Sequence, residues 1–390
     1  MTMHIAMFSD SYLPYVSGVV RSIESFTQEL RARGHTVSIF APAYPNQGLD
    51  GPYIYRYPSV RTHHHGFTLA VPISPKLART ARALKPDVIH VHSPFIMGRA
   101  GARLARQLGV PLVFTHHTLY DEYVHYVPLA PRTLARRVTV RLVTAFANRC
   151  QMVIAPSRTV EQRIRAQGVT APIRVIPTGI DPQVLASGDP QWLARTWGVP
   201  PGEPVLLYVG RLAKEKNLDF LLEAFARVAS RVPKAWLVFA AGGPEREHLE
   251  ARARELGIAQ RFIITGTLPH ERVVDAYAGA DLFIFASQTE TQGLVIGESM
   301  AAGLPVVAVA ASGVTDLVRD GVDGYLTPHA LEPFVERIVQ LLEQPELRRR
   351  MGEQARAQAE TISVARTTDA LLEAYAAAGA RPGRVATTSA

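Results

Sequence analysis

Short apolar stretches alternate with helical stretches along most of this chain, and this alternation constrains the fold more than any other feature. Residues 4–8, 88–91 and 282–285 are short and apolar, whereas the stretch from Ser17 to Leu30 places Ile23 and Phe26 at helical spacing. Strands that alternate with helices pair in parallel, and their helices cover both faces of the sheet. The sequence therefore predicts an α/β fold.

The alternation is broken once, over residues 181–204, by a segment with five prolines. A length of 390 residues also fits two domains better than one. We therefore expect two Rossmann-like domains, over 1–180 and 205–362, that face each other across a cleft and are joined by a linker over 181–204. Ligands of such sheets bind outside the carboxyl ends of the strands. The small, polar and basic residues 379–390 predict a disordered tail.

Composition excludes several classes of protein. With 47% hydrophobic and 19% charged residues, the chain cannot be wholly disordered. Its one cysteine, Cys150, permits no internal disulfide and favours a reducing compartment. Residues 4–8 turn polar at Ser9, which predicts a strand rather than a signal peptide, and no run reaches the roughly 18 apolar residues of a membrane span.

The formal net charge of +8 favours anionic partners such as nucleotides, nucleic acid or acidic lipid. Nucleic acid is not expected, because the charge is spread over both halves and no basic and aromatic recognition module is present.

Two acids flank an expected turn between a strand and a helix. Glu290 follows the apolar strand 282–285, Gly293 stands where a helix begins, and Glu298 lies about one turn into that helix. Free N–H groups at a helix start bind anions. A hydrolase needs carboxylates that face each other across the cleaved bond. Two acids on the same side of a site are better suited to binding hydroxyl groups. We expect a ligand with hydroxyls and phosphates, the alternative being a helix cap and dipole partner.

Three further loops follow expected strands. Gly210 and Arg211 begin a loop with Lys216, whose cations could neutralise a diphosphate leaving group, or the loop could simply be solvated. Gly18 begins a helix and could admit a phosphate oxygen, although no dinucleotide fingerprint or Walker loop is present. His117 could hydrogen-bond a sugar, while His116 is better explained as a core or capping residue.

No metal site is expected. His63, His64 and His65 have no spacing that would complete one with other ligands, and they predict a surface loop.

Residues 131–149 predict a basic amphipathic helix. Its apolar stripe consists of Leu134, Val138, Leu142, Ala145 and Phe146. Arg132 and Arg136 flank the stripe on one side, and Arg137 and Arg141 flank it on the other. This pattern is typical of a helix that lies in an anionic membrane surface. The alternative is a crossover helix packed on the sheet. The preceding aromatic loop, 120–128, could meet an acceptor or lipid headgroups.

Taken together, these motifs resemble the retaining glycosyltransferases of family 4, which have the GT-B fold. The resemblance covers nearly the whole chain. It is carried by Ser17-Gly18-Val19, Phe114-Thr115-His116-His117-Thr118, Gly210-Arg211-Leu212 with Lys216, and the pair Glu290 and Glu298. Within the family, residues 289–295 and loop 120–128 look like bacterial enzymes that glycosylate diacylglycerol. The resemblance also implies a C-terminal helix, over 363–378, that crosses back to the N-terminal domain.

The family implies a role for each matching residue. Arg211 and Lys216, beside Gly210, would bind the donor diphosphate, with Gly18 near the phosphate. Glu290 would contact the transferred hexose, the amides around Gln292, Gly293 and Leu294 would hold sugar and phosphates, and Glu298 would bind the ribose. His117 matches the active-site histidine; His117, Arg211, Lys216 and Glu290 are the expected catalytic residues. Asp10, Tyr12, Tyr123 and Tyr126 are the expected acceptor-binding residues.

The expected activity is transfer of glucose or galactose, with retention, from a UDP-sugar to diacylglycerol or a glycolipid. No cofactor or tightly bound metal is expected beyond the nucleotide sugar. The expected place is the inner face of the cell membrane, where the cytoplasmic enzyme would bind peripherally through the basic helix. The alternatives are a mannosyl- or glucosyltransferase for a soluble or polysaccharide acceptor, and a nucleotide-sugar epimerase.

Overall fold

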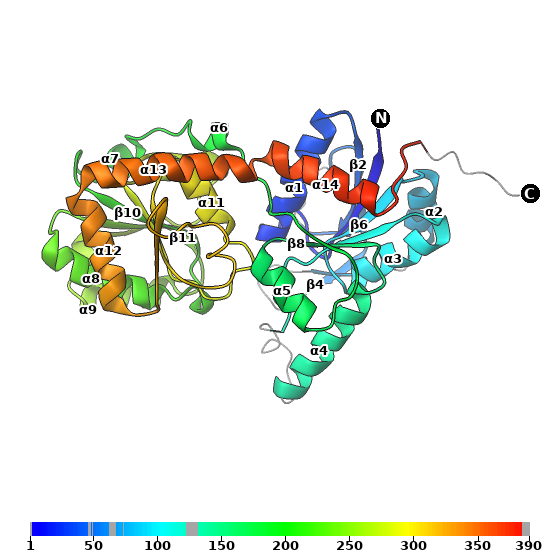
Figure 1. Cartoon of the computed structure of the whole chain (residues 1–390), viewed down its shortest axis with the longest axis horizontal. Coiled ribbons are helices and arrows are strands. Elements are labelled where there is room, and N and C mark those ends of the chain that lie inside the picture. Colours follow the sequence, from blue (N-terminus) through cyan, green and yellow to red (C-terminus); the bar gives the residue numbers. More distant parts are fainter. Residues whose placement is uncertain are drawn as a thin grey trace, which may run out of the picture. The chain divides into compact units, whose positions relative to one another are not determined.

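The computed structural model describes residues 2–45, 48, 50–61, 68–72, 74–121 and 132–383. The chain divides into two compact units (Figure 1). Unit 1 comprises Met1–Gly179 and Val364–Ala390, and unit 2 is the continuous segment Ile180–Ser363.

Unit 1 is built on a seven-stranded parallel sheet. Its strands are β1 (His4–Phe8), β2 (Thr36–Pro42), β3 (Ile54–Tyr57), β6 (Val88–Val91), β7 (Leu112–Thr115), β8 (Met152–Ala155) and β9 (Ile173–Val175). The order is β3-β2-β1-β6-β7-β8-β9, so β1 pairs with β2 on one side and β6 on the other. A separate antiparallel pair, β4 (Ser59–Arg61) with β5 (Thr68–Ala70), was not predicted.

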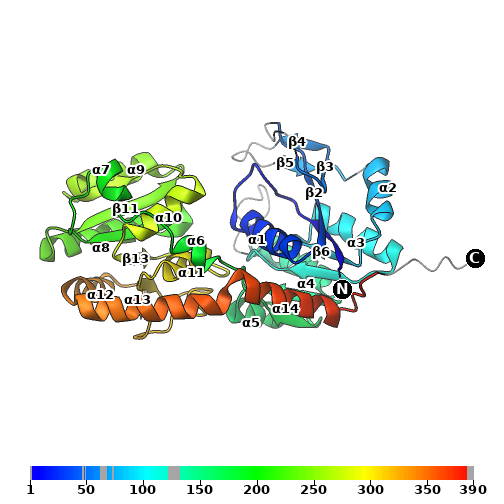
Figure 2. The ribbon, with the colours of Figure 1, turned by 90° about the horizontal axis from the view of Figure 1, so that it is seen from above.

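Helices cover both faces of this sheet, as parallel pairing requires. One apolar cluster joins the sheet to α2 (Pro75–Ala83), α3 (Ile96–Leu108), α4 (Arg132–Ala147) and α5 (Arg158–Ala166). A second cluster joins the opposite face to α1 (Gly18–Ala32) and α14 (Val364–Ala377). Figure 2 shows α1 and α14 side by side.

Helix α14 is an integral part of unit 1, although it follows unit 2 in the chain. Leu371, Ala374 and Tyr375 are at most 1% exposed and lie in the same apolar cluster as the buried face of α1. At the surface, Arg33, the residue that follows α1, donates to Asp369 on α14.

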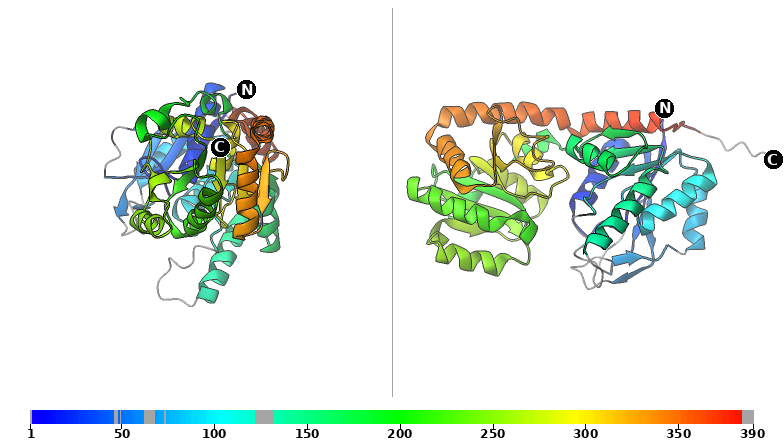
Figure 3. Two further views of the ribbon diagram at one scale, coloured as in Figure 1. Left: turned by 90° about the vertical axis from the view of Figure 1, so that its left-hand side faces the viewer. Right: turned by 60° about the horizontal axis from the view of Figure 1, so that its bottom comes forward.

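Unit 2 repeats the plan with a six-stranded parallel sheet. Its order is β12-β11-β10-β13-β14-β15. The strands are β10 (Val205–Arg211), β11 (Trp236–Gly242), β12 (Phe262–Ile264), β13 (Leu282–Phe285), β14 (Val306–Val309) and β15 (Gly324–Thr327). The larger helices are α8 (Leu218–Arg231), α9 (Arg246–Glu255), α10 (His270–Ala278), α11 (Leu294–Ala301), α12 (Leu331–Glu343) and α13 (Pro345–Ala359). They share one apolar core with the sheet (Figure 3).

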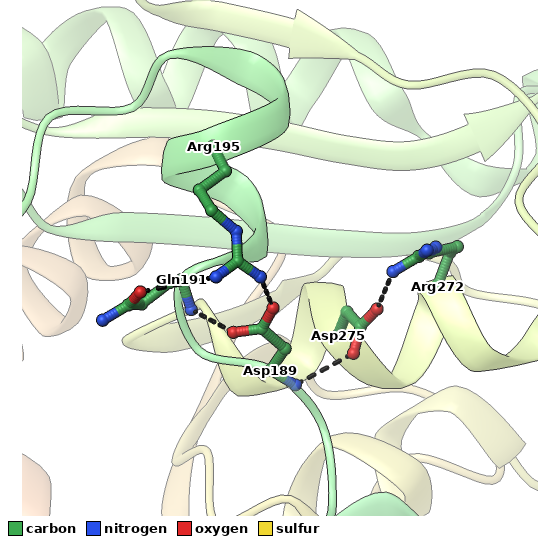
Figure 4. A network of polar contacts seen from close by, with 5 residues as sticks. All are labelled: Asp189, Gln191, Arg195, Arg272 and Asp275. Atoms are coloured by element: carbon green, nitrogen blue, oxygen red, sulfur yellow. Dashed lines mark hydrogen bonds and ion pairs between the residues drawn. The ribbon is translucent and has the colours of Figure 1, made fainter.

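Residues 181–204, expected as a linker, fold against unit 2 and contribute two short helices, α6 (Pro182–Leu185) and α7 (Trp192–Trp197). Trp192 and Leu193 are buried in the unit 2 core. Asp275 on α10 fixes the segment, because its Oδ1 accepts the backbone N–H of Asp189 at 2.9 Å while its Oδ2 accepts Arg272 at 2.8 Å (Figure 4).

The predicted α/β architecture of two Rossmann-like domains is confirmed. No helix in the described ranges combines the length and the apolar character that crossing a bilayer requires.

The network of Figure 4 predicts a stability difference between two substitutions. Asp275→Ala leaves a backbone N–H and a guanidinium without their acceptor, so the free energy of unfolding of unit 2 should fall by about 1–3 kcal/mol. All three tryptophans, Trp192, Trp197 and Trp236, lie in unit 2, so urea unfolding followed by tryptophan fluorescence reports on this unit.

Arg195→Ala is the matched control. Arg195 donates to Asp189 in the same network, but its side chain is 61% exposed. Loss of that exposed pair should cost less than about 1 kcal/mol. Equal destabilisation by the two variants would show that Asp275 does not anchor the segment.

Candidate active site

In each unit the strand order reverses beside the first strand, and the candidate residues gather there. In unit 2, β10 lies between β11 and β13, so the loops after β10 and β13 leave the sheet side by side in opposite directions. Gly210 and Arg211 end β10, and Glu290 follows β13. Such a switch point, at the carboxyl ends of parallel strands, is where open α/β sheets bind ligands.

An ion pair joins the two loops of unit 2. The Lys216 Nζ lies 2.5 Å from Glu290 Oε1, and the two side chains are only 19% and 18% exposed. A half-buried ion pair of this kind holds both charged groups in position, while part of each side chain stays accessible to solvent. The sequence predicted that both residues belong to one site, and the structure brings them into contact.

Further contacts hold the same two loops together. The Ser287 Oγ donates to the carbonyl of Glu215 at 3.4 Å, and the Asn217 Nδ2 donates to the carbonyl of Ala286 at 3.3 Å. Gly313, in the turn after β14, lies against this loop: a Cβ on it would lie 2.8 Å from both the Gln292 nitrogen and the Glu290 carbonyl oxygen. The backbone around Glu290 is therefore fixed from two sides.

Arg211 presents its guanidinium at the surface of unit 2. Its side chain is 54% exposed and donates to Glu215 Oε1 at 2.5 Å. Burial acts to raise the pKa of Glu215, but its own backbone N–H, Arg211 and Lys216 outweigh burial and hold that pKa below its usual value. Glu215 is thus an anion that orients Arg211. Beneath the loop, burial and then the charges of Glu290 and Glu215 raise the pKa of Tyr208, which donates to the Arg211 carbonyl at 3.2 Å.

The turn after Glu290 starts helix α11 without a side-chain cap. Gly293 has φ +76°, a left-handed conformation that glycine adopts without strain, and no side chain caps the helix there. Gln292 and Gly293 are buried, and Leu294 is half-buried. Glu298 is 9% exposed and accepts the Tyr277 hydroxyl at 2.9 Å. The N-terminal turn of α11 can therefore accept an anion, with Glu298 held by Tyr277 one turn further on.

In unit 1 the corresponding reversal lies between β1 and β6. Asp10, which follows β1, accepts the Ser93 hydroxyl and the Met97 backbone N–H, the latter at 2.9 Å. Burial raises the pKa of Asp10. This carboxyl, expected to bind an acceptor, joins the loop after β1 to the start of α3.

Tyr12 and Gly18 occupy different environments in the same loop region. Tyr12 is 3% exposed and its hydroxyl donates to Glu24 on α1. Gly18, the first residue of α1, is exposed, and a Cβ there would meet open space. Ser17 caps α1, since its Oγ accepts the Val20 N–H at 3.3 Å. Gly18 thus lies at an open helix N-terminus, whereas the Tyr12 side chain is packed in unit 1.

His117, itself half-buried, belongs to a cluster of histidines that the sequence did not reveal, in which His90 and His92 are buried. The His92 Nδ1 and His117 Nε2 atoms are 2.9 Å apart, so one ring donates to the other. His92 packs on His90, with ring centroids 4.2 Å apart, and His90 pairs with the Tyr375 hydroxyl at 2.8 Å and the Thr115 hydroxyl at 2.6 Å. The cluster links β6, β7 and α14.

Burial keeps these histidines neutral. Burial, with the charge of a neighbouring histidine, lowers the pKa of His90 and of His117 to about 3, and it also lowers the pKa of His92. His116 is 3% exposed, and burial lowers its pKa to about 4. A neutral His117 can serve as a hydrogen-bond donor or acceptor but is not a cation at pH 7.

Three predicted features cannot be placed in this geometry. Tyr123 and Tyr126, the other expected acceptor-binding residues, lie outside the described residues, as do His63, His64 and His65 and the start of the basic helix at Pro131. In the described residues, no group of three or more histidine, cysteine, aspartate or glutamate side chains is arranged to hold a metal ion.

Comparison with known families decides the identity of the chain. Residues 16–184 match the family described as Glycosyltransferase Family 4, and residues 193–358 match Glycosyl transferases group 1. An alpha-monoglucosyldiacylglycerol synthase from Streptococcus pneumoniae is 35% identical over 340 residues, which is 83% of this chain and 75% of the relative. The chain belongs to the family 4 glycosyltransferases.

Other relatives of this glycosyltransferase differ in their names. An alpha-monoglucosyldiacylglycerol synthase from Acholeplasma laidlawii is 30% identical over 88% of this chain and 89% of the relative. A GDP-mannose-dependent alpha-mannosyltransferase from Corynebacterium glutamicum is 31% identical over 83% of this chain and 76% of the relative. Among solved structures, sucrose-phosphate synthase from Thermosynechococcus elongatus superposes with a TM-score of 0.79 at 21% identity, covering 96% of this chain and 98% of that one. That likeness confirms the GT-B fold.

Several residues that contact the predicted site residues of the glycosyltransferase were not predicted from the sequence. Asn217, Tyr277, His92 and Ser93 each contact a predicted residue or its loop. His90 and His92 stand in and after a stretch that was recognised only as an apolar strand. The sequence did contain a signal for them: a buried polar residue such as His90 needs a hydrogen-bond partner, and a second polar residue, His92, follows at the carboxyl end of the same strand.

The histidine cluster predicts acid sensitivity. An unfolded histidine binds a proton below its ordinary pKa of about 6.5, whereas folded His90 and His117 do so only near pH 3. The unfolded state therefore binds more protons between these limits, and the stability of unit 1 should fall as pH falls through this window. Each such histidine contributes up to about 1.4 kcal/mol per pH unit.

His90→Asn should flatten this pH dependence, measured as the calorimetric unfolding temperature between pH 7.5 and 4.5. His248→Asn, at a side chain 53% exposed in unit 2, is the control and should leave the slope unchanged. An unaltered slope in His90→Asn would contradict the assignment. Tryptophan fluorescence identifies the transition of unit 2, which should not respond.

Lys216 and Lys214 predict a contrast in activity within one loop. Lys216→Met removes the cation paired with Glu290, and the sugar-transfer rate should fall by about 10²- to 10³-fold, as for loss of one group that stabilises transition-state charge. Lys214→Met changes an exposed lysine two residues away and should retain nearly full activity.

A double variant separates charge from stability. Lys216→Met with Glu290→Gln leaves no unpaired buried charge, so its unfolding temperature should recover towards that of the parent while its transfer rate stays low. Recovery of both rate and stability would show that Lys216 has only a structural role.

Proposed function

We propose that this glycosyltransferase is a retaining hexosyltransferase that moves glucose or galactose from a UDP-sugar to diacylglycerol or a glycolipid. One observation carries the proposal: a half-buried Lys216–Glu290 pair stands at the strand reversal of unit 2, beside the open turn of α11. It combines a cation for phosphate, a carboxylate for sugar hydroxyls and backbone donors for an anion in one place.

In the proposed reaction, the bond between the sugar anomeric carbon and the diphosphate oxygen breaks. The acceptor hydroxyl oxygen bonds to that carbon on the same face, and the hydroxyl proton passes to the leaving phosphate oxygen. Arg211 and Lys216 stabilise the negative charge that builds on the diphosphate, the largest electrostatic demand of the step. Their two positive charges perform this role without a tightly bound metal ion.

The remaining donor residues position the substrate. We propose that Glu290 binds the hexose hydroxyls, that the turn at Gln292, Gly293 and Leu294 binds sugar and phosphates, and that Glu298 binds the ribose. Lys216 pairs with the Oε1 atom of Glu290, and we propose that the other carboxylate oxygen accepts hydrogen bonds from the hexose hydroxyls. In unit 1, Gly18 and the neutral His117 are the proposed phosphate- and sugar-binding residues.

Two observations support the lipid acceptor. The relatives from Streptococcus pneumoniae and Acholeplasma laidlawii are named for monoglucosyldiacylglycerol synthesis. On α4, Leu134, Val138 and Leu142 are 55%, 46% and 47% exposed, an apolar row on the surface of a helix rich in arginine. We propose that this row lies on an anionic membrane at the inner face of the cell membrane.

A second candidate is a mannosyltransferase that uses GDP-mannose. It is favoured by the relative from Corynebacterium glutamicum, whose name specifies that donor and whose identity, at 31%, is close to that of the diacylglycerol enzymes. The candidates differ in nucleotide base and hexose, neither of which Lys216 and Glu290 distinguish.

A donor and acceptor panel tests the proposal. The purified full chain is incubated with UDP-glucose, UDP-galactose or GDP-mannose, with vesicles that contain diacylglycerol or with soluble sugars and polyols, and products are identified by mass. We expect a hexosyl-diacylglycerol from a UDP-sugar, with the α-linkage confirmed by nuclear magnetic resonance. Lys216→Met serves as the inactive control.

Each contrary product overturns one part of the proposal. Transfer only from GDP-mannose overturns the donor assignment, and transfer only to soluble acceptors overturns the lipid assignment. A β-linked product overturns retention. Conversion of the donor without any acceptor would identify an epimerase.

A further inference from the structure

An arginine-lined groove runs between α3 and α4 of unit 1, away from the candidate active site. Its volume is about 970 Å³. Residues 109–112, which lead into the amino end of β7, line its floor, whereas His117 follows the carboxyl end of that strand. The groove and the active-site edge are therefore at opposite ends of β7, and none of the predicted site residues lines the groove.

The groove is strongly positive. Arg99, Arg103 and Arg106 on α3 and Arg149 after α4 all line it and are all exposed. Neither helix contains a single acidic residue. Among the residues that the structure describes, these four guanidinium groups form no ion pair with a carboxylate.

Helix dipoles do not account for these arginines. A cation is favoured by a dipole only in the last turn of a helix. Arg106 lies in the last turn of α3, but Arg99 and Arg103 lie in its first and middle turns. Arginine offers a planar fork of donors that matches phosphate oxygens, so the groove has the donors of a phosphate site.

The other wall of the groove is apolar and continuous with the exposed row on α4. Leu142 and Ala145 line the groove, and Leu142 also belongs to the row with Leu134 and Val138. The face of α4 that packs on the sheet is different, because it consists of Val143, Phe146 and Ala147. The sequence predicted one stripe including Phe146, but packing buries Phe146 and leaves the rest of the stripe at the surface. Figures 1 and 3 show α4 at the edge of unit 1.

We propose that the groove between α3 and α4 binds one molecule of an anionic phospholipid, with its phosphate on the arginines and an acyl chain along Leu142 and Ala145 towards Val138. The occupant is a lipid rather than a free anion, because only a molecule with an apolar chain uses both walls. This proposal does not depend on the proposed sugar transfer. It implies that each chain binds one lipid molecule at a defined site, in addition to any general attraction between the basic surface and an anionic membrane.

A monomeric lipid tests the proposal without a membrane. Dihexanoyl phosphatidylglycerol, below its micelle concentration, is titrated into the full chain and followed by isothermal calorimetry, with dihexanoyl phosphatidylcholine and inorganic phosphate in parallel. We expect saturable binding of one phosphatidylglycerol per chain, at least about tenfold tighter than binding of either comparison ligand.

Two variants assign that binding to the groove. Arg103→Gln removes one phosphate donor, and Ala145→Trp fills the groove without changing charge; each should weaken binding by at least about tenfold. Arg174→Gln, at an exposed arginine on β9 outside the groove, removes the same charge and should leave binding unchanged. Circular dichroism and sugar transfer to a soluble or detergent-dispersed acceptor check that the variants fold.

Three outcomes would overturn the proposal. If phosphate binds as tightly as the lipid, the site takes a free anion. If Arg174→Gln weakens binding as much as Arg103→Gln, the attraction is general. If Ala145→Trp binds normally, the lipid lies elsewhere. Because binding is read directly, failure of the proposed sugar transfer would leave these results intact.

Discussion

Parallel pairing of strands is the constraint on which the rest of this structure depends. Parallel strands deliver all their carboxyl ends to one edge of the sheet, and the chain must return to the other edge through a helix. Where the strand order reverses, two consecutive loops diverge and leave room for a ligand. This places Lys216 against Glu290 in unit 2, and Asp10 against Ser93 in unit 1. The α3–α4 groove lies at the amino end of β7, opposite to the carboxyl end that His117 follows.

Charge is handled differently in the two units of this glycosyltransferase. Unit 2 keeps opposite charges paired at its reversal point, through Lys216 with Glu290 and Arg211 with Glu215, so each cation is held in a fixed orientation. Unit 1 instead has neutral polar groups at its reversal point, the buried His90, His92 and Tyr375 and the half-buried His117, which are stabilised by hydrogen bonds. Pre-oriented cations need little rearrangement when charge develops on a leaving group.

Much of this could be predicted because it depends on local pattern. Strands β1, β6 and β13 agree with the predicted bounds, since short apolar runs define them. The partners of site residues could not be predicted, because Tyr375 and His90 are 285 residues apart. Nor could periodicity decide which apolar row of α4 faces the sheet. This helix has apolar residues in two adjacent rows, and both rows have helical spacing. β15, four residues beginning with glycine, carried no strand signal.

The placement of α14 has a consequence for how the chain is made. Unit 2 is a continuous segment inserted in unit 1. Helix α14 supplies the buried Leu371, Ala374 and Tyr375, and the segment after it supplies Ala380, to a core whose other buried members precede residue 177. During synthesis, unit 2 can fold as soon as it emerges, because every part of it is contiguous. Until the ribosome has finished unit 2, unit 1 lacks the helix that covers part of one face of its sheet. For that interval the apolar surface under α14, which includes Met152 and Ile154 of β8, is exposed, and nascent unit 1 is a natural client for a chaperone.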